Sequence, residues 1–273
     1  MSLLEVKQLK VWDSSTEQVL VANSSFQLAK GHCLAIVGES GSGKSLTCKA
    51  IMRLNQAKVQ QSGSIVLDGV DLSLLNKRAM RGYRGKRICM IMQNGMRAFN
   101  PSRPVGAYLG EVLARHYDWS KEEKLTRIGA AMTSVGLKDP ASVMRSYPYE
   151  LSGGMLQRVM IALSIVMEPD VIIADEPTTA LDAVTQFEVM EQLAKLRNRL
   201  DCAMIFVSHD LHAVKRIAND VLVMKDGEII ERGTAADFFT RARHPYTRQL
   251  ITAKQSLSRQ FNQLMGGASV AQG

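Results

Sequence analysis

The sequence has no apolar run long enough to cross a membrane. The longest candidate, Val159–Met167, stops at Glu168 and Pro169, short of the roughly 18 uninterrupted apolar residues that a membrane-spanning helix needs. The opening MSLLEVKQLKVW also lacks a basic segment followed by an apolar one, which is the pattern of a secretory signal. These absences predict an intracellular protein.

Cysteine is scarce, and its four positions, Cys33, Cys48, Cys89 and Cys202, lie far apart. No pair has the spacing of a zinc site or of a redox dithiol. Cys48 and Cys89 stand among apolar residues, which favours buried free thiols. The sequence therefore predicts no transition-metal site.

Acidic residues are the minority among the charged ones. The chain has 34 lysines and arginines against 26 aspartates and glutamates, for a formal net charge of +8. Such an excess is compatible with binding nucleic acid, anionic lipid or nucleotide. No long basic run appears, however, so a solvated basic surface is the simpler interpretation.

What the sequence does contain is an alternation of strand and helix patterns. Residues 3–12 and 19–29 show partial apolar alternation and predict two opening strands. From Asn94 to about Ile165 helical spacing dominates, which predicts a helical insertion. Elsewhere, strands alternating with helices predict an α/β fold whose largely parallel sheet is covered on both faces. Further predicted strands are 33–38, 64–69, 88–93, 171–174, 203–207 and 221–224, and predicted helices are 44–54, 105–116, 121–135, 155–167, 186–199 and 211–218.

A glycine-rich loop after the strand at 33–38 fits the phosphate-loop pattern G-x-x-x-x-G-K-[ST]. Glycines let backbone N–H groups turn toward anionic oxygens, and the helix that follows directs its positive end at the same phosphates. Lys44 would contact the terminal phosphates, and the Ser45 hydroxyl would ligate Mg²⁺. The residues predicted to bind nucleotide here are Gly38, Glu39, Ser40, Gly41, Ser42, Gly43, Lys44, Ser45 and Leu46.

Two adjacent acids end the apolar strand Val171–Ala174. Asp175 is suited to hold Mg²⁺ directly or through water, and Glu176 could polarise an attacking water as a general base. The alternative interpretation is an acid pair that caps the next turn, helped by Pro177. The phosphate loop favours the catalytic interpretation.

Between these two motifs lies Leu151–Gln157, with the sequence LSGGMLQ. Ser152 is a reasonable helix cap, but with the other motifs the segment resembles the signature sequence of ABC-transporter ATPases. The resemblance covers the chain up to about Ala253 and implies a P-loop ATPase core with an N-terminal antiparallel β subdomain and a helical signature subdomain. It implies an ATPase domain over 1–253, with 94–165 inserted, and leaves 254–273 as a mobile tail.

The resemblance also implies roles for further residues. Gln93 is similar to the glutamine that contacts the Mg²⁺ or the attacking water, and His209 to the histidine that steadies the γ-phosphate. Ala180–Asp182 resembles the loop that crosses the dimer interface. Trp12 is the available aromatic for stacking on adenine, although a place in the core is equally open.

Pairing follows from the same resemblance. Ser152, Gly153 and Gly154 of one subunit would close over the γ-phosphate of ATP held by a partner, supplying amide donors. The implied partners are a second ABC ATPase subunit, either another copy or a related chain, and transmembrane permease subunits. A substrate-binding protein outside the cytoplasm is also implied, which places this chain at the cytoplasmic face of the inner membrane.

The cargo is indicated by the segment Arg243–Leu250, which resembles the C-terminal element of the peptide/nickel import subfamily. Four segments look closest to the nickel-importer ATPase, which favours nickel or a metal–chelator complex over di- or oligopeptides. A non-transport ABC ATPase and a regulator without turnover are the rival classes, and no nucleic-acid partner is expected. The four segments are Gly43–Cys48, Ile91–Asn94, Ala98–Pro101 and Ser152–Arg158.

Overall fold

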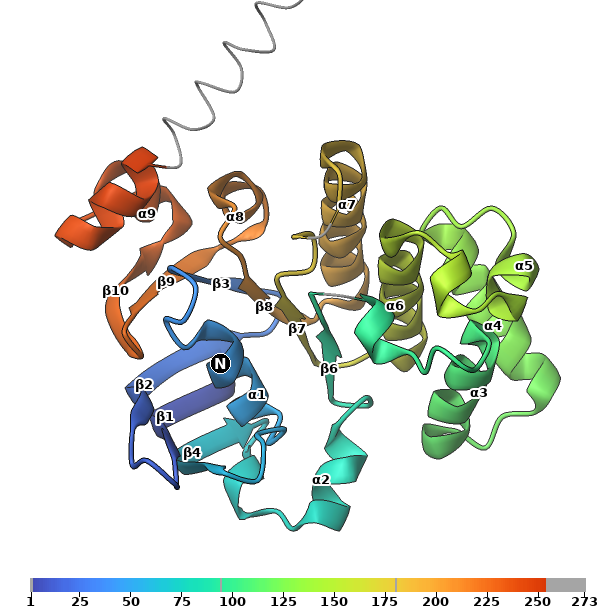
Figure 1. The fold of residues 1–273 in the computed structure, drawn as a ribbon, viewed down its shortest axis with the longest axis horizontal. Helices are drawn as coiled ribbons and strands as arrows, with labels where there is room; N and C mark the ends of the chain where they lie inside the picture. The colour runs from blue at the N-terminus through green and yellow to red at the C-terminus, as the bar shows by residue number, and fades with distance from the viewer. Residues whose placement is uncertain (1, 94, 180, 254–273) are drawn as a thin grey trace, which may run out of the picture.

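The computed structural model describes residues 2–93, 95–179 and 181–253, so the predicted tail at 254–273 lies outside the described residues. The chain forms two sheets and a group of helices at one side (Figure 1). The strands are β1 (Ser2–Asp13), β2 (Val19–Ala29), β3 (Cys33–Val37), β4 (Val59–Leu67), β5 (Val70–Asp71), β6 (Ile88–Ile91), β7 (Val171–Asp175), β8 (Ala203–Val207), β9 (Asp220–Lys225) and β10 (Glu228–Thr234). The α-helices are α1 (Lys44–Ile51), α2 (Lys77–Tyr83), α3 (Val105–His116), α4 (Lys121–Ser134), α5 (Pro140–Arg145), α6 (Gly153–Met167), α7 (Ala183–Leu200), α8 (Leu211–Ile217) and α9 (Ala235–Thr240), and residues 245–253 are also helical.

The larger sheet has six strands in the order β10-β9-β3-β8-β7-β6. Strands β9, β3, β8, β7 and β6 pair in parallel, and β10 pairs with β9 in antiparallel fashion. All five residues of β3 are buried, and alternate side chains enter two different apolar cores. This pattern arises because successive strand side chains point to opposite faces of a sheet that is covered on both sides. The predicted, largely parallel α/β sheet is confirmed.

The smaller sheet is antiparallel, in the order β2-β1-β4-β5. Strand β4 begins at Val59, before the predicted start at residue 64, because it pairs along β1 as far as Asp13. Leu4 of this sheet, Ile51 of α1 and Ile36 of β3 belong to one apolar core. Helix α1 is thus packed between the two sheets, which fixes the position of its N-terminus.

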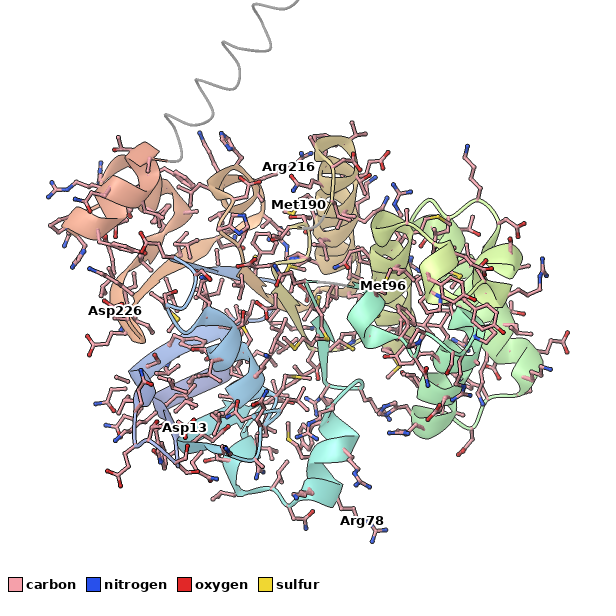
Figure 2. The ribbon with its side chains drawn as sticks, in the orientation of Figure 1. Asp13, Arg78, Met96, Met190, Arg216 and Asp226 are labelled. Atoms are coloured by element: carbon pink, nitrogen blue, oxygen red, sulfur yellow. The ribbon has the colours of Figure 1, made fainter. Side chains whose placement is uncertain are left out.

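Helices α3 to α6 form the group at the side of the six-stranded sheet (Figure 1). Side chains of Ser120, Asp139 and Ser152 cap α4, α5 and α6. Met190 of α7 lies in the larger core, whereas Arg78 is at the periphery (Figure 2). Among the described residues, no helix is both long and apolar enough to cross a membrane.

Most predicted helices are present, but several end points were wrong. The first helix stops at Ile51 instead of Leu54, because Arg53 takes a left-handed conformation with φ 50°. Helices α6 and α7 begin earlier than predicted, at Gly153 and Ala183, because a side-chain cap directly precedes each. Caps act over three residues, so they set helix starts more sharply than apolar spacing does.

Candidate functional site

The predicted phosphate loop joins β3 to α1 at the carboxyl end of the parallel strands. A Cβ atom on Gly38 would lie 2.1 Å from the carbonyl oxygen of Met224. Only glycine therefore fits at this position, where the chain leaves β3 next to β9. Gly43 precedes α1 with φ 98°, and among the described residues no side chain caps this helix. The first amides of α1 are therefore available to an anion.

Lys44 is buried at the start of α1, with 5% of its surface exposed. Its Nζ donates to the carbonyl oxygens of Gly38 at 2.9 Å and Glu39 at 2.7 Å. Burial lowers the pKa of Lys44, while the carboxylates of Glu176 and Asp175 oppose that shift. Anionic oxygens would be stronger partners for this ammonium than the neutral carbonyls that hold it here.

Asp175 ends β7 beside α1. The Ser45 hydroxyl donates to its Oδ1 at 2.8 Å, which joins the two halves of the predicted magnesium site. Burial raises the pKa of Asp175, against the hydrogen bond from Ser45. A buried carboxylate next to a hydroxyl is poised for a cation, because a cation would offset the cost of burying its charge.

Glu176 is the point where three loops meet. Its Oε2 accepts from Gln93 Nε2 at 3.2 Å and from Thr179 Oγ1 at 3.1 Å, and it lies 3.5 Å from His209 Nδ1. The residue has φ 47°, and its N–H donates to the carbonyl of Val207 at 2.9 Å. The loops after β6, β7 and β8 therefore bring the predicted Gln93, Glu176 and His209 together.

A cavity of about 330 Å³ lies between the phosphate loop and Glu176. Sequence reasoning missed Leu20 of β2, which lines it, and Thr179, which binds Glu176. Trp12 is not one of the described residues that line this cavity, and the Lys10 ammonium lies 5.7 Å from the centroid of its ring. The stacking role of Trp12 stays a prediction. The lining residues are Leu20, Ser40, Gly41, Gly43, Lys44, Ser45, Leu46, Gln93 and Glu176.

The signature segment packs against the start of α7. Ser152 Oγ accepts from the Met155 amide at 3.2 Å and so caps α6, as predicted. A Cβ on Gly154 would lie 2.3 Å from Thr185 Cγ2, and Thr185 Oγ1 donates to Asp182 Oδ2 at 2.7 Å. The segment is in contact with the predicted interface loop, of which Ala180 lies outside the described residues. None of the described residues that line the phosphate cavity belongs to segment 152–154.

The residues predicted to ligate Mg²⁺ at this site carry oxygen donors. Ser45, Gln93 and Asp175 supply hydroxyl, amide and carboxylate oxygens, which suit Mg²⁺ when phosphate and water complete its shell. Within the described ranges, no group of three or more His, Cys, Asp or Glu side chains is placed to hold a metal ion. The four cysteines are buried free thiols, which confirms the prediction made for Cys48 and Cys89.

Comparison with known proteins gives consistent matches. A family model described as “ABC transporter” matches residues 21–179. The metal-staphylopine import system ATP-binding protein CntD of Staphylococcus aureus (strain NCTC 8325 / PS 47) is 45% identical over 267 residues, covering 98% of each chain. The dipeptide transport ATP-binding protein DppD of Bacillus subtilis (strain 168) is 43% identical over 234 residues, covering 85% of this chain and 70% of that protein. The oligopeptide transport ATP-binding protein OppD of the same strain is 41% identical over 261 residues, covering 93% and 72%.

A solved structure supports the same fold. The dimeric ATP-binding cassette MJ0796, in a post-hydrolysis state bound to ADP and Pi, superposes with a TM-score of 0.75 and 25% identity. The match covers 85% of this chain and 98% of that one.

Proposed function

Because this chain belongs to the ABC transporter family of ATP-hydrolysing proteins, as its motifs predicted, we propose that it drives import of a metal–chelator complex. It works as one of a pair of ATPase subunits on a membrane permease. The observation that supports the catalytic part is the convergence of Gln93, Thr179 and His209 on the Glu176 carboxylate beside the phosphate loop.

The residues divide the work of hydrolysis between binding and proton transfer. The Lys44 ammonium exchanges the backbone carbonyls of Gly38 and Glu39 for the terminal phosphates. The α1 amides hold the adjacent phosphate oxygens. Glu176 Oε2 accepts a proton from the attacking water, whose oxygen Gln93 helps to orient. His209 steadies the γ-phosphate from the opposite loop.

Ser45 and Asp175 would hold magnesium through their oxygens, and the ion would supply positive charge that offsets the charge of the phosphates. Asp175 contributes a carboxylate that is held in place by Ser45 before any cation arrives. Burial disfavours the ionised form of Asp175, and a bound cation would stabilise that form.

A second ATPase subunit completes the ATP site of this chain. Ser152, Gly153 and Gly154 serve a partner subunit's nucleotide in this proposal, which agrees with their absence from the lining of this chain's own phosphate cavity. Closure around ATP and release after hydrolysis then bias the permease between two conformations. A substrate-binding protein outside the membrane delivers the cargo, and this chain lies at the cytoplasmic face of the inner membrane.

The cargo assignment is supported by the full-length match to a metal–staphylopine importer subunit, at 98% of both chains. The dipeptide and oligopeptide relatives are nearly as similar, but only 70% and 72% of their lengths are covered. A di- or oligopeptide is therefore the second candidate. In this proposal the other subunits select the cargo.

The catalytic assignment is tested with the purified chain. We expect Glu176→Gln to lower the Mg-dependent ATPase rate by about 10²- to 10⁴-fold while ATP binding is retained, since only the proton acceptor is lost. Glu228→Gln, at an exposed glutamate of β10, is the matched control. Equal rates for Glu176→Gln and the parent would refute the assignment of the base. A parent rate that rises faster than linearly with protein concentration would indicate self-pairing.

The cargo is tested by uptake in the native host with this chain deleted. We expect loss of accumulation of radiolabelled nickel, cobalt or zinc supplied with a chelator, restored by the parent chain and not by Lys44→Ala. Loss of labelled dipeptide uptake with intact metal uptake would establish the second candidate instead.

A further inference from the structure

The peptide bond between Gly38 and Glu39 is held at both of its polar groups. Its carbonyl, from Gly38, accepts from Lys44 Nζ at 2.9 Å. Its N–H, from Glu39, donates to the hydroxyl oxygen of Tyr246 at 3.0 Å, across 207 positions of sequence. Because a peptide unit is planar, fixing both groups fixes the orientation of the whole unit.

Tyr246 is itself firmly placed. Its side chain is 7% exposed, and Lys225 Nζ lies 5.2 Å from the ring centroid. Its N–H donates to His244 Nδ1 at 3.2 Å, within the turn that precedes the helix at 245–253. These contacts restrict the movement of the Tyr246 hydroxyl relative to the phosphate loop.

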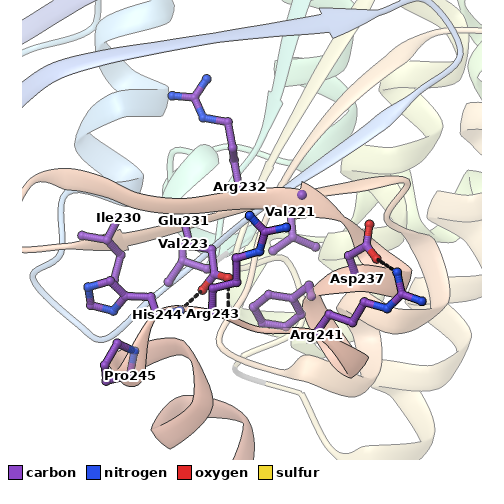
Figure 3. Close-up of a pocket in the computed structure, with 12 residues that line it drawn as sticks. Val221, Val223, Ile230, Glu231, Arg232, Asp237, Arg241, Arg243, His244 and Pro245 are labelled. Carbon is purple, nitrogen blue, oxygen red and sulfur yellow. Dashed lines mark hydrogen bonds and ion pairs between the residues drawn. The ribbon is translucent and has the colours of Figure 1, made fainter.

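The turn that carries Tyr246 is anchored to the six-stranded sheet by Glu231 of β10. The two carboxylate oxygens of Glu231 accept from the amides of Arg243 at 2.6 Å and His244 at 3.2 Å (Figure 3). Burial favours the neutral form of the Glu231 carboxyl group, but these hydrogen bonds hold the pKa of Glu231 below its usual value. The same turn closes one side of a cavity of about 600 Å³. Hydrogen bonds, joined through the covalent frames of His244 and Tyr246, thus connect β10 to the phosphate loop.

We propose that Tyr246 is a positioning residue for nucleotide binding, which sets the Gly38–Glu39 peptide and, through it, the place from which Lys44 reaches the phosphates. This proposal rests on the nucleotide role of the phosphate loop given above. Tyr246 contacts the loop backbone and acts on ATP only through Gly38, Glu39 and Lys44. The C-terminal turn is then part of the ATP site, although it follows the last motif of the catalytic core.

The test compares Tyr246→Phe with the parent and with Tyr117→Phe. Tyr117 is a matched control, because its hydroxyl also forms a hydrogen bond with the backbone, donating to the carbonyl of Met167 at 3.2 Å, but lies in the helical group. A hydrogen bond of this kind corresponds to an effect of about two- to tenfold. We expect Tyr246→Phe to raise the Kd for ATP by that factor, with kcat within twofold of the parent, and Tyr117→Phe to leave the Kd unchanged.

A second readout does not depend on nucleotide. Hydrogen exchange in a peptide covering residues 34–46, measured without ATP, should be faster in Tyr246→Phe than in either the parent or Tyr117→Phe. Glu231→Gln replaces one acceptor of the turn and should raise the Kd in the same direction, with less than additive effect in the double variant.

The outcomes separate the two proposals. An unchanged Kd and unchanged exchange in Tyr246→Phe would overturn the positioning role, as would equal effects from Tyr117→Phe. Faster exchange in Tyr246→Phe, together with a parent chain that binds no ATP, would support the contact between Tyr246 and the loop and refute the nucleotide role of the loop.

Discussion

Gly154 is the glycine whose replacement tests the packing of the signature segment most directly. A methyl group there would lie 2.3 Å from Thr185 Cγ2. Thr185 cannot move away easily, because Asp182 holds its hydroxyl at 2.7 Å and its amide at 3.0 Å. We therefore expect Gly154→Ala to strain the start of α7.

The size of the effect follows from two opposing contributions. Overpacking of this kind costs about 1–3 kcal/mol, whereas alanine in place of glycine within a helix returns about 1 kcal/mol. The expected net loss in the free energy of unfolding is about 0–2 kcal/mol. A second substitution, at Thr185, separates the overpacking cost from the helix-propensity gain. Thr185→Ser removes Cγ2 and keeps the hydroxyl, so the double variant should recover the overpacking cost of about 1–3 kcal/mol as a coupling energy.

Urea denaturation of the isolated chain, followed by circular dichroism, measures all four members of this cycle. Gly129→Ala in α4 is the control, since a methyl group there would meet nothing within 4 Å, and it should stabilise by about 1 kcal/mol. The reasoning would be refuted if Gly154→Ala stabilised as much as Gly129→Ala. It would also be refuted if Thr185→Ser gave no recovery.

Two further predictions concern titratable groups. Because burial raises the pKa of Asp175 above its ordinary value of 3.8, its ionised form opposes folding. Asp175→Asn should match the parent in stability below that pH and exceed it increasingly as pH rises through the shifted pKa, in urea unfolding with EDTA and no nucleotide; a difference that shrinks with rising pH would contradict this. Burial raises the pKa of Cys33 and Cys89 to about 12, so at pH 8 iodoacetamide should label them only after denaturation. Prompt labelling of the native chain would show that these thiols are accessible.

The phosphate loop, the acid pair and most of the strands could be predicted because each follows from rules that act within a few residues. The G-x-x-x-x-G-K-S pattern specifies its own turn and helix. Strands β3 and β8, and β7 up to Ala174, are continuous apolar runs, as buried parallel strands are. The predicted strand at 203–207 matches β8 at both ends, whereas the first helix was predicted too long at its C-terminal end.

The contacts between distant parts of the chain were not predictable in the same way. Leu20 lines the phosphate cavity because β2 packs beside α1, and nothing in its neighbours marks it. Thr179 reaches Glu176 only because the backbone after β7 turns at φ 47°. Both depend on how elements are stacked, which local spacing does not encode.

The elements and the chemistry of the phosphate site could be predicted from short segments of the chain, because backbone geometry and apolar periodicity are local. Tertiary structure alone decided which groups meet: Gln93 and His209 at Glu176, and Tyr246 at the amide of Glu39. The hydroxyl of Tyr246 is joined to the phosphate loop across 207 positions, and the hydrogen bond exists only because the helix at 245–253 packs beside the loop. A tyrosine after a His-Pro turn carries no local signal of that partner, since the partner is a backbone N–H that every residue except proline possesses.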